Sequence, residues 1–100
     1  MVEYPAVAEP FVQRMAGKML ANPSAMKDFA AYVTDVRLAG KPIPEEIARD
    51  PVKYEAFIRG VRFETEKLVA ESLRNLAVGR VLDEVDAMIH DLIKLYYGVY

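Results

Sequence analysis

The sequence predicts an all-α protein, a small bundle of four to five helices in a single domain. Apolar residues make up 53% of its 100 residues, which is enough for a hydrophobic core. From Pro51 to about Tyr97 they recur every three or four positions, the spacing of one helical face. Two pairs, Asn22-Pro23 and Asp50-Pro51, are typical of helix starts.

Residues 1–40 are expected to form a pair of helices. The first begins near Pro5 or Pro10, since proline is tolerated in a first helical turn, and ends at Asn22-Pro23. That pair also starts the second helix, because the asparagine side chain can accept hydrogen bonds from free backbone N–H groups. Gly40 can adopt the left-handed conformation that closes the second helix. The expected core stripes are Phe11, Val12, Met15, Met19 and Leu20 in the first helix, and Met26, Phe29, Ala30, Val33 and Val36 or Leu38 in the second.

Residues 41–50 are expected to connect the two halves of the chain. Pro42 and Pro44 disfavour helix in the residues before them, so the first part of this stretch should be extended. One helical turn can follow at Glu45 to Ala48, with acidic groups near the positive end of the helix dipole. Asp50-Pro51 then opens a long helical region.

The long region, residues 51–100, exceeds what one straight helix in a compact domain allows. At a rise of 1.5 Å per residue an unbroken helix would reach on the order of 70 Å. The chain must therefore bend, break or extend to a partner. Glycine costs about 1 kcal/mol relative to alanine inside a helix, so a kink or turn is expected near Gly79. The expected stripe is Tyr54, Phe57, Ile58, Val61, Leu68, Val69, Leu73 and Leu76, then Val78, Val81, Val85, Met88, Leu92 and Leu95, broadened by Leu82, Ile89 and Tyr96.

Composition and charge limit the classes of function. A formal net charge of -2 argues against a general nucleic-acid binder, since phosphate binding needs an excess of Lys and Arg. The absence of cysteine excludes disulfides, thiolate metal sites and a Cys nucleophile. We expect a cytoplasmic (intracellular) protein, because the first residues lack the basic start and apolar run of a signal peptide and no uncharged run suits a membrane helix. One Gln and two Asn beside abundant Arg, Glu, Ala and Val fit a thermophilic source.

Near the C-terminus, Ile93, Tyr96 and Tyr97 follow His90 at distances of three, six and seven residues. This spacing resembles the sliding-clamp-binding box, in which one helical turn presents an aliphatic and two aromatic anchors to a hydrophobic pocket. His90 stands where that motif has glutamine. The resemblance implies an accessory factor of nucleic-acid processing that docks on a clamp. In the alternative interpretation these residues belong to the core or close the end of the bundle: Ile93, Tyr96, Tyr97, Val99 and Tyr100.

Basic residues of the long region offer a second route to nucleic acid. Arg59 and Arg62 lie beside the aromatic Tyr54 and Phe63, and rings next to arginines can stack on bases of DNA or RNA. In the alternative interpretation this face is solvated and carries ion pairs one turn apart. The spacings that predict such pairs are Glu55 to Arg59, Arg62 to Glu66 and Lys67 to Glu71.

Asp83, Asp86 and His90 share one face of the last helix, and a divalent metal could use the last two. Ligands from one helix do not complete a metal site, and the chain has no second histidine, so no metal is expected and a helix-stabilising ion pair is the alternative.

Catalysis and a cofactor are not expected either, because the single histidine lies away from any candidate nucleophile and no glycine-rich phosphate loop occurs. We therefore expect a non-enzymatic interaction or assembly subunit without a membrane partner. It would self-associate as a homodimer, or dock on a larger complex, through apolar helical faces. The candidate contact residues are Phe63, Ile93, Tyr96, Tyr97 and Tyr100.

Overall fold

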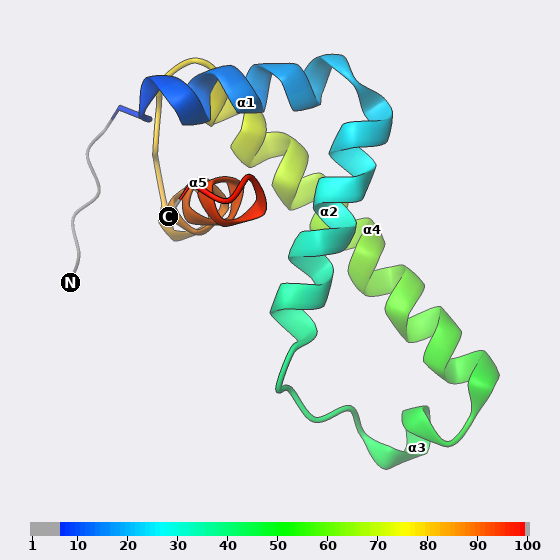
Figure 1. Cartoon of the computed structure of the whole chain (residues 1–100). Helices are drawn as coiled ribbons and strands as arrows, with labels where there is room; N and C mark the ends of the chain where they lie inside the picture. The colour runs from blue at the N-terminus through cyan, green and yellow to red at the C-terminus, as the bar shows by residue number, and fades with distance from the viewer. Residues whose placement is uncertain (1–6, 100) are drawn as a thin grey trace.

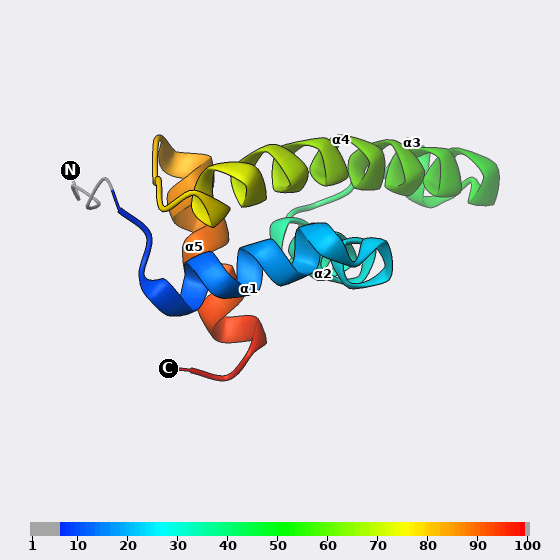
Figure 2. The ribbon, with the colours of Figure 1, turned by 90° about the horizontal axis from the view of Figure 1, so that it is seen from above.

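Five helices make up residues 7–99, the part of the chain that the computed structural model describes, and no strand occurs there. They are α1 (Pro10–Ala21), α2 (Pro23–Leu38), α3 (Glu45–Ala48), α4 (Pro51–Ala77) and α5 (Glu84–Tyr96) (Figure 1). The predicted all-α bundle is confirmed. α4 is the central element, since it contacts each of the other four helices. Figure 2 shows α4 lying over a layer formed by α1 and α2, with α5 running across both at one end.

The two predicted caps start α2 and α4. The Asn22 side chain accepts hydrogen bonds from the backbone N–H groups of Ser24 and Ala25, at 3.1 and 3.3 Å. Asp50 plays the same part for α4, with its carboxylate 2.9 Å from the Val52 nitrogen. In both helices proline occupies the first position, where a missing donor costs nothing. Of the two starts proposed for the first helix, the structure has Pro10.

The predicted break near Gly79 is a full turn. α4 ends at Ala77, and Gly79 has a φ of +82°, a conformation that glycine adopts at little cost. The Gly79 N–H donates to the Leu76 carbonyl at 3.0 Å, and the Arg80 N–H donates to the Asn75 carbonyl at 2.9 Å. This pair of bonds is a Schellman motif, which satisfies carbonyls at a helix end. α5 is therefore a separate helix with a new direction.

The core lies where α1, the middle of α2, the second half of α4 and α5 meet (Figures 1 and 2). Its largest fully buried apolar side chains are Val12, Met19, Phe29, Val33, Val69, Leu73, Leu76, Ile89 and Ile93. A hydrogen bond joins α2 and α4 beside the core: the buried Thr65 Oγ1 of α4 accepts from Arg37 Nη1 of α2 at 2.9 Å.

The first half of α4 projects beyond this core. None of residues 51–64 is buried, and Thr65 is the first buried residue of α4. Figure 1 shows α2 and α4 crossing and then diverging, with residues 39–44 and α3 connecting their ends. The Cα radius of gyration is 14.8 Å, above the roughly 13 Å of a compact 100-residue domain. This extension carries surface that the protomer does not cover.

The apolar stripe predicted for the long region is wrong at six positions. Those that are more than a third exposed are Tyr54, Leu68, Val78, Leu82, Leu95 and Tyr96. Val78, Leu82 and Leu95 are exposed because the stripe was continued through Gly79 with one helical period, whereas Val78 and Leu82 lie between the two helices and α5 starts anew after the turn. Tyr54 lies in the half of α4 that projects beyond the core. The face that α5 buries is rotated by one residue and includes Asp86, Ile89, His90 and Ile93.

Candidate protein interface

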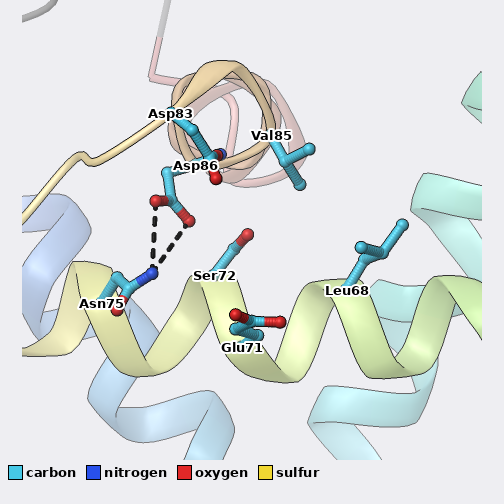
Figure 3. Close-up of a pocket in the computed structure, with 7 residues that line it drawn as sticks. All are labelled: Leu68, Glu71, Ser72, Asn75, Asp83, Val85 and Asp86. Carbon is cyan, nitrogen blue, oxygen red and sulfur yellow. Dashed lines mark hydrogen bonds between the residues drawn. The ribbon is translucent and has the colours of Figure 1, made fainter.

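Asp86 is a buried structural carboxylate. It is 1% exposed, and its oxygens accept two hydrogen bonds from Asn75 Nδ2 of α4, at 3.3 and 3.2 Å (Figure 3). They also accept one from the Leu82 backbone N–H at 3.0 Å. Asp83 caps α5 by accepting from the Asp86 N–H at 3.0 Å. Asp86, which was considered as a metal ligand with His90, and Asp83 on the same face therefore both hold the turn between α4 and α5. Within residues 7–99, no group of three or more His, Asp or Glu side chains is placed to hold a metal ion.

A small pocket of about 60 Å³ lies beside Asp86, between α4 and α5. It is lined by Leu68, Glu71, Ser72, Asn75, Asp83, Val85 and Asp86 (Figure 3). A space of this size suits one or two water molecules rather than an organic ligand, since ligand pockets are typically about 300–1,000 Å³.

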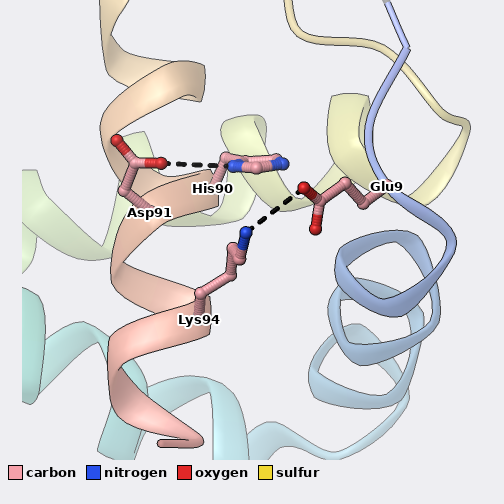
Figure 4. Close-up of polar contacts among 4 residues, drawn as sticks. All are labelled: Glu9, His90, Asp91 and Lys94. Atoms are coloured by element: carbon pink, nitrogen blue, oxygen red, sulfur yellow. Dashed lines mark hydrogen bonds and ion pairs between the residues drawn. The ribbon is translucent and has the colours of Figure 1, made fainter. Parts of the chain in front are cut away.

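His90 is also buried rather than presented at the surface. It is 8% exposed, and its Nδ1 lies 3.4 Å from Asp91 Oδ1 (Figure 4). One turn later, Lys94 Nζ donates to Glu9 Oε1 at 3.2 Å, which ties α5 to the start of α1 (Figure 4). The position that corresponds to glutamine in the clamp-binding box is therefore not available to a partner in this conformation.

The three anchors of the clamp-like segment do not share an exposed face. Ile93 is fully buried in the core, whereas Tyr96 and Tyr97 are 40% and 41% exposed. An aliphatic anchor in the core cannot enter a clamp pocket unless the end of α5 detaches. Tyr100, the remaining candidate at this end, lies outside the described residues.

Tyr96 and Tyr97 belong to an aromatic cluster that joins three helices. Its members are Phe11 of α1, Phe29 and Tyr32 of α2, and the two tyrosines. The Tyr96 ring centroid lies 5.1 Å from Tyr32, 5.4 Å from Phe29 and 5.1 Å from Tyr97, in edge-to-face geometry. Tyr97 continues the chain to Phe11 at 6.1 Å. Tyr32 was not among the core residues predicted for the second helix, although its spacing of three from Phe29 places both rings on one helical face.

The aromatic cluster leaves its outer rim exposed. Leu95, Tyr97 and Val99 are 52%, 41% and 47% exposed. Partial burial, together with the neighbouring Tyr96, raises the pKa of Tyr97 above its usual 10.0. The cluster is therefore part of the fold on its inner side and an apolar surface on its outer side.

A second apolar surface lies on α4, on the side opposite the core. At about 100° per residue, five exposed residues share this side, which we name the outer face: Val52, Ala56, Gly60, Phe63 and Lys67. Val52 is 77% and Phe63 59% exposed, and a Cβ at Gly60 would meet nothing within 4 Å. Lys67 Nζ lies 4.3 Å from the centre of the Phe63 ring. The outer face is therefore open, with small residues between two large apolar ones.

Charged residues of both signs border the outer face. Of the three predicted ion pairs, Arg59 with Glu55 is present, at 2.6 Å. Among the described residues, Arg62 with Glu66 and Lys67 with Glu71 do not come within ion-pair distance, and Lys67 lies over Phe63 instead. Arg59 and Arg62 are both exposed, and acidic neighbours surround them on α4. Their charges thus do not form an uninterrupted basic strip.

Comparison with protein families, with characterised proteins and with solved structures finds no match to this chain. None of the described helices is long and apolar enough to cross a membrane. The outer face of α4 and the rim of the aromatic cluster are the features from which we infer a function.

Proposed function

We propose that this protein is a non-enzymatic assembly subunit that associates with copies of itself through exposed apolar helical faces. The observation that carries the proposal is the outer face of α4. It lies on the half of α4 that projects from the core, and it exposes Val52 and Phe63 at 77% and 59%.

The energetics favour covering this face. Complete burial of a valine or phenylalanine side chain contributes roughly 1.5–3 kcal/mol. Each of two subunits would bury both residues, which is enough to offset part of the entropy lost on association. Phenylalanine is also one of the aromatic residues enriched in interface cores.

The projecting half of α4 has a structural need for such a contact. Isolated helices shorter than about 12–15 residues are marginal in water, and most helical stability comes from packing. Residues 51–64 have only half-buried apolar contacts, such as those of Phe57 and Ile58, on their inner side. A partner on the outer side would stabilise a helix that the protomer supports on one side only.

The rim of the aromatic cluster offers a second contact surface. It lies near the C-terminus, whereas the outer face begins at the opposite end of the molecule (Figures 1 and 2). A subunit with two separate apolar surfaces can extend an assembly beyond a pair, which suits the proposed role.

Light scattering coupled to size exclusion tests the proposal. The protomer has a mass of 11.3 kDa, and we expect the weight-average mass to rise towards twice that value or more between about 1 μM and about 1 mM. Because apolar burial drives the association, high salt should not abolish it. Single-stranded DNA added at low salt tests the nucleic-acid hypothesis for Arg59 and Arg62 in parallel. A protein that stays at 11.3 kDa throughout this range contradicts self-association.

A further inference from the structure

We infer that the small pocket between α4 and α5 binds one divalent cation such as Mg²⁺ or Ca²⁺, through the Asp83 and Asp86 carboxylates and the Ser72 hydroxyl. This site goes beyond the proposed self-association and does not depend on it. Two buried polar groups beside the pocket carry the inference, because the protein leaves both of them incompletely paired: the Asp86 carboxylate and the Ser72 hydroxyl.

The Asp86 carboxylate is buried without a positive partner. It is 1% exposed, and none of the ion pairs within residues 7–99 includes it. Its hydrogen-bond donors are the neutral Asn75 amide and the Leu82 backbone N–H. Buried charges in proteins are paired or coordinate metals, because removing a charge from water is costly. A positive charge beside Asp86 would therefore have to come from a bound ion.

Ser72 supplies the second observation. It is 2% exposed, and its hydroxyl makes no hydrogen bond to the described part of the chain. No fully enclosed side-chain oxygen or nitrogen lacks a partner there, so the small exposed surface of Ser72 includes the hydroxyl. Ser72 lines the pocket, and Figure 3 shows its side chain pointing from α4 towards Asp83 and Asp86. A hydroxyl oxygen has two lone pairs, one of which can bind a cation.

The charge of the pocket selects a cation. Of its seven lining residues, Glu71, Asp83 and Asp86 are acidic and none is basic. Asp83 caps α5 through Oδ1, and within residues 7–99 its Oδ2 accepts no hydrogen bond. Glu71 is exposed and adds negative charge beside the pocket. Carboxylate and hydroxyl oxygens are hard ligands, which Mg²⁺ and Ca²⁺ prefer.

Two carboxylates and one hydroxyl suit an ion that keeps part of its water shell. Mg²⁺ is usually bound through one or two carboxylates and retains several waters. The pocket of about 60 Å³ has room for the ion with one or two of these waters. Because fewer than three acidic side chains bind the ion, we expect a dissociation constant of about 1 mM.

A cation at this point would join α4 to α5 across the turn at Gly79. Ser72 belongs to α4, whereas Asp83 caps α5 and Asp86 lies in its first turn. The bound ion would stabilise the folded protein, because the unfolded chain does not hold these ligands together.

Thermal unfolding and NMR test the site on the wild-type protein. We titrate Mg²⁺, Ca²⁺ or Mn²⁺ at constant ionic strength, so that general screening stays the same. At ten times the dissociation constant, Tm should rise by about 5 °C or more. Substoichiometric Mn²⁺, which is paramagnetic, should broaden the amide signals of Ser72 and residues 82–86 before those of the exposed Glu45 and Glu46.

A matched pair of cap variants tests the ligands. Asp83→Asn removes a charge but keeps the cap of α5, because asparagine caps a helix as well as aspartate does. It should raise the dissociation constant of the cation at least about tenfold, and Ser72→Ala should raise it at least about threefold. Asp50→Asn makes the same change at the cap of α4, which does not line the pocket, and should leave the dissociation constant unchanged.

Two results would overturn the inference. One is no rise in Tm and no selective broadening with any of the three ions up to about 20 mM, which would mean that the pocket binds only water. The other is an equal effect of Asp83→Asn and Asp50→Asn, which would mean that the ion responds to the acidic surface in general. Either result leaves the proposed self-association standing, because light scattering tests that separately.

Discussion

Replacing Gly60 by alanine should stabilise the protomer. Gly60 lies inside α4 and is exposed, and it is not one of the glycines with a positive φ. A Cβ at this position would meet nothing within 4 Å, so the substitution adds no steric cost. The glycine-to-alanine difference in helix propensity then predicts a gain of about 0.8–1.0 kcal/mol, or a rise in Tm of about 4–8 °C for a domain of this size.

Gly79 provides the contrasting control. Its φ of +82° is unfavourable for residues with a Cβ, although a Cβ there would only make ordinary contacts with the Gln13 side chain at 3.7–3.8 Å. Gly79→Ala should therefore destabilise the protein by about 1–2 kcal/mol through backbone strain alone. The same chemical change thus has opposite effects at two positions of one chain.

Urea unfolding followed by circular dichroism measures both effects. The protein should be kept well below about 1 μM, the start of the range in which association is expected, so that association does not contribute to the free energy of unfolding. Equal m-values would show that the variants and the wild type expose the same surface area on unfolding. A Gly60→Ala variant no more stable than the wild type would refute the reasoning, because it would mean that the first half of α4 does not unfold with the core.

Three further predictions concern Asp86, Phe63 and Tyr97. Asp86→Ala removes the acceptor of the Asn75 and Leu82 hydrogen bonds at a site that is 1% exposed, and should lower the free energy of unfolding by about 2–3 kcal/mol in urea; a loss below about 0.5 kcal/mol would contradict this. Phe63→Ala should cost the protomer no more than about 1 kcal/mol but weaken self-association at least tenfold by sedimentation, and unchanged association would exclude Phe63 from the interface. The folded-state pKa of Tyr97 is raised above 10.0, its usual value in an unfolded chain, so its ionisation does not affect stability at neutral pH. Once pH exceeds 10.0 the unfolded chain loses this proton more readily than the folded protein, and stability falls. Tyr97→Phe should therefore lose less stability than the wild type between about pH 9 and pH 11, and identical losses would contradict the raised pKa.

The elements whose signals are local could be predicted from the sequence. Asn22 and Asp50 cap α2 and α4 as expected, because an N-cap acts through the next two or three residues and needs no tertiary information. The break near Gly79 could also be predicted, because glycine weakens a helix at any position, whatever the helix packs against.

The face of α5 could not be predicted in the same way. Its buried side contains Asp86 and His90, which hydropathy alone assigns to solvent. Asp86 is tolerated there because Asn75, on a different helix, and the Leu82 backbone satisfy its carboxylate. The aromatic cluster has the same origin, since Phe11 and Tyr32 reach the end of α5 only through the packing of three helices.

Gly60 links the stability of the protomer to the proposed self-association. In the protomer it weakens α4 relative to alanine, and nothing nearby requires the absence of a side chain. In the proposed association it lies within the outer face, where the missing Cβ leaves room for a partner to approach the α4 backbone. Gly60 thus opposes folding of the single chain and favours close approach of a second chain. The same face that is unfavourable for a lone protomer is then the one suited to association.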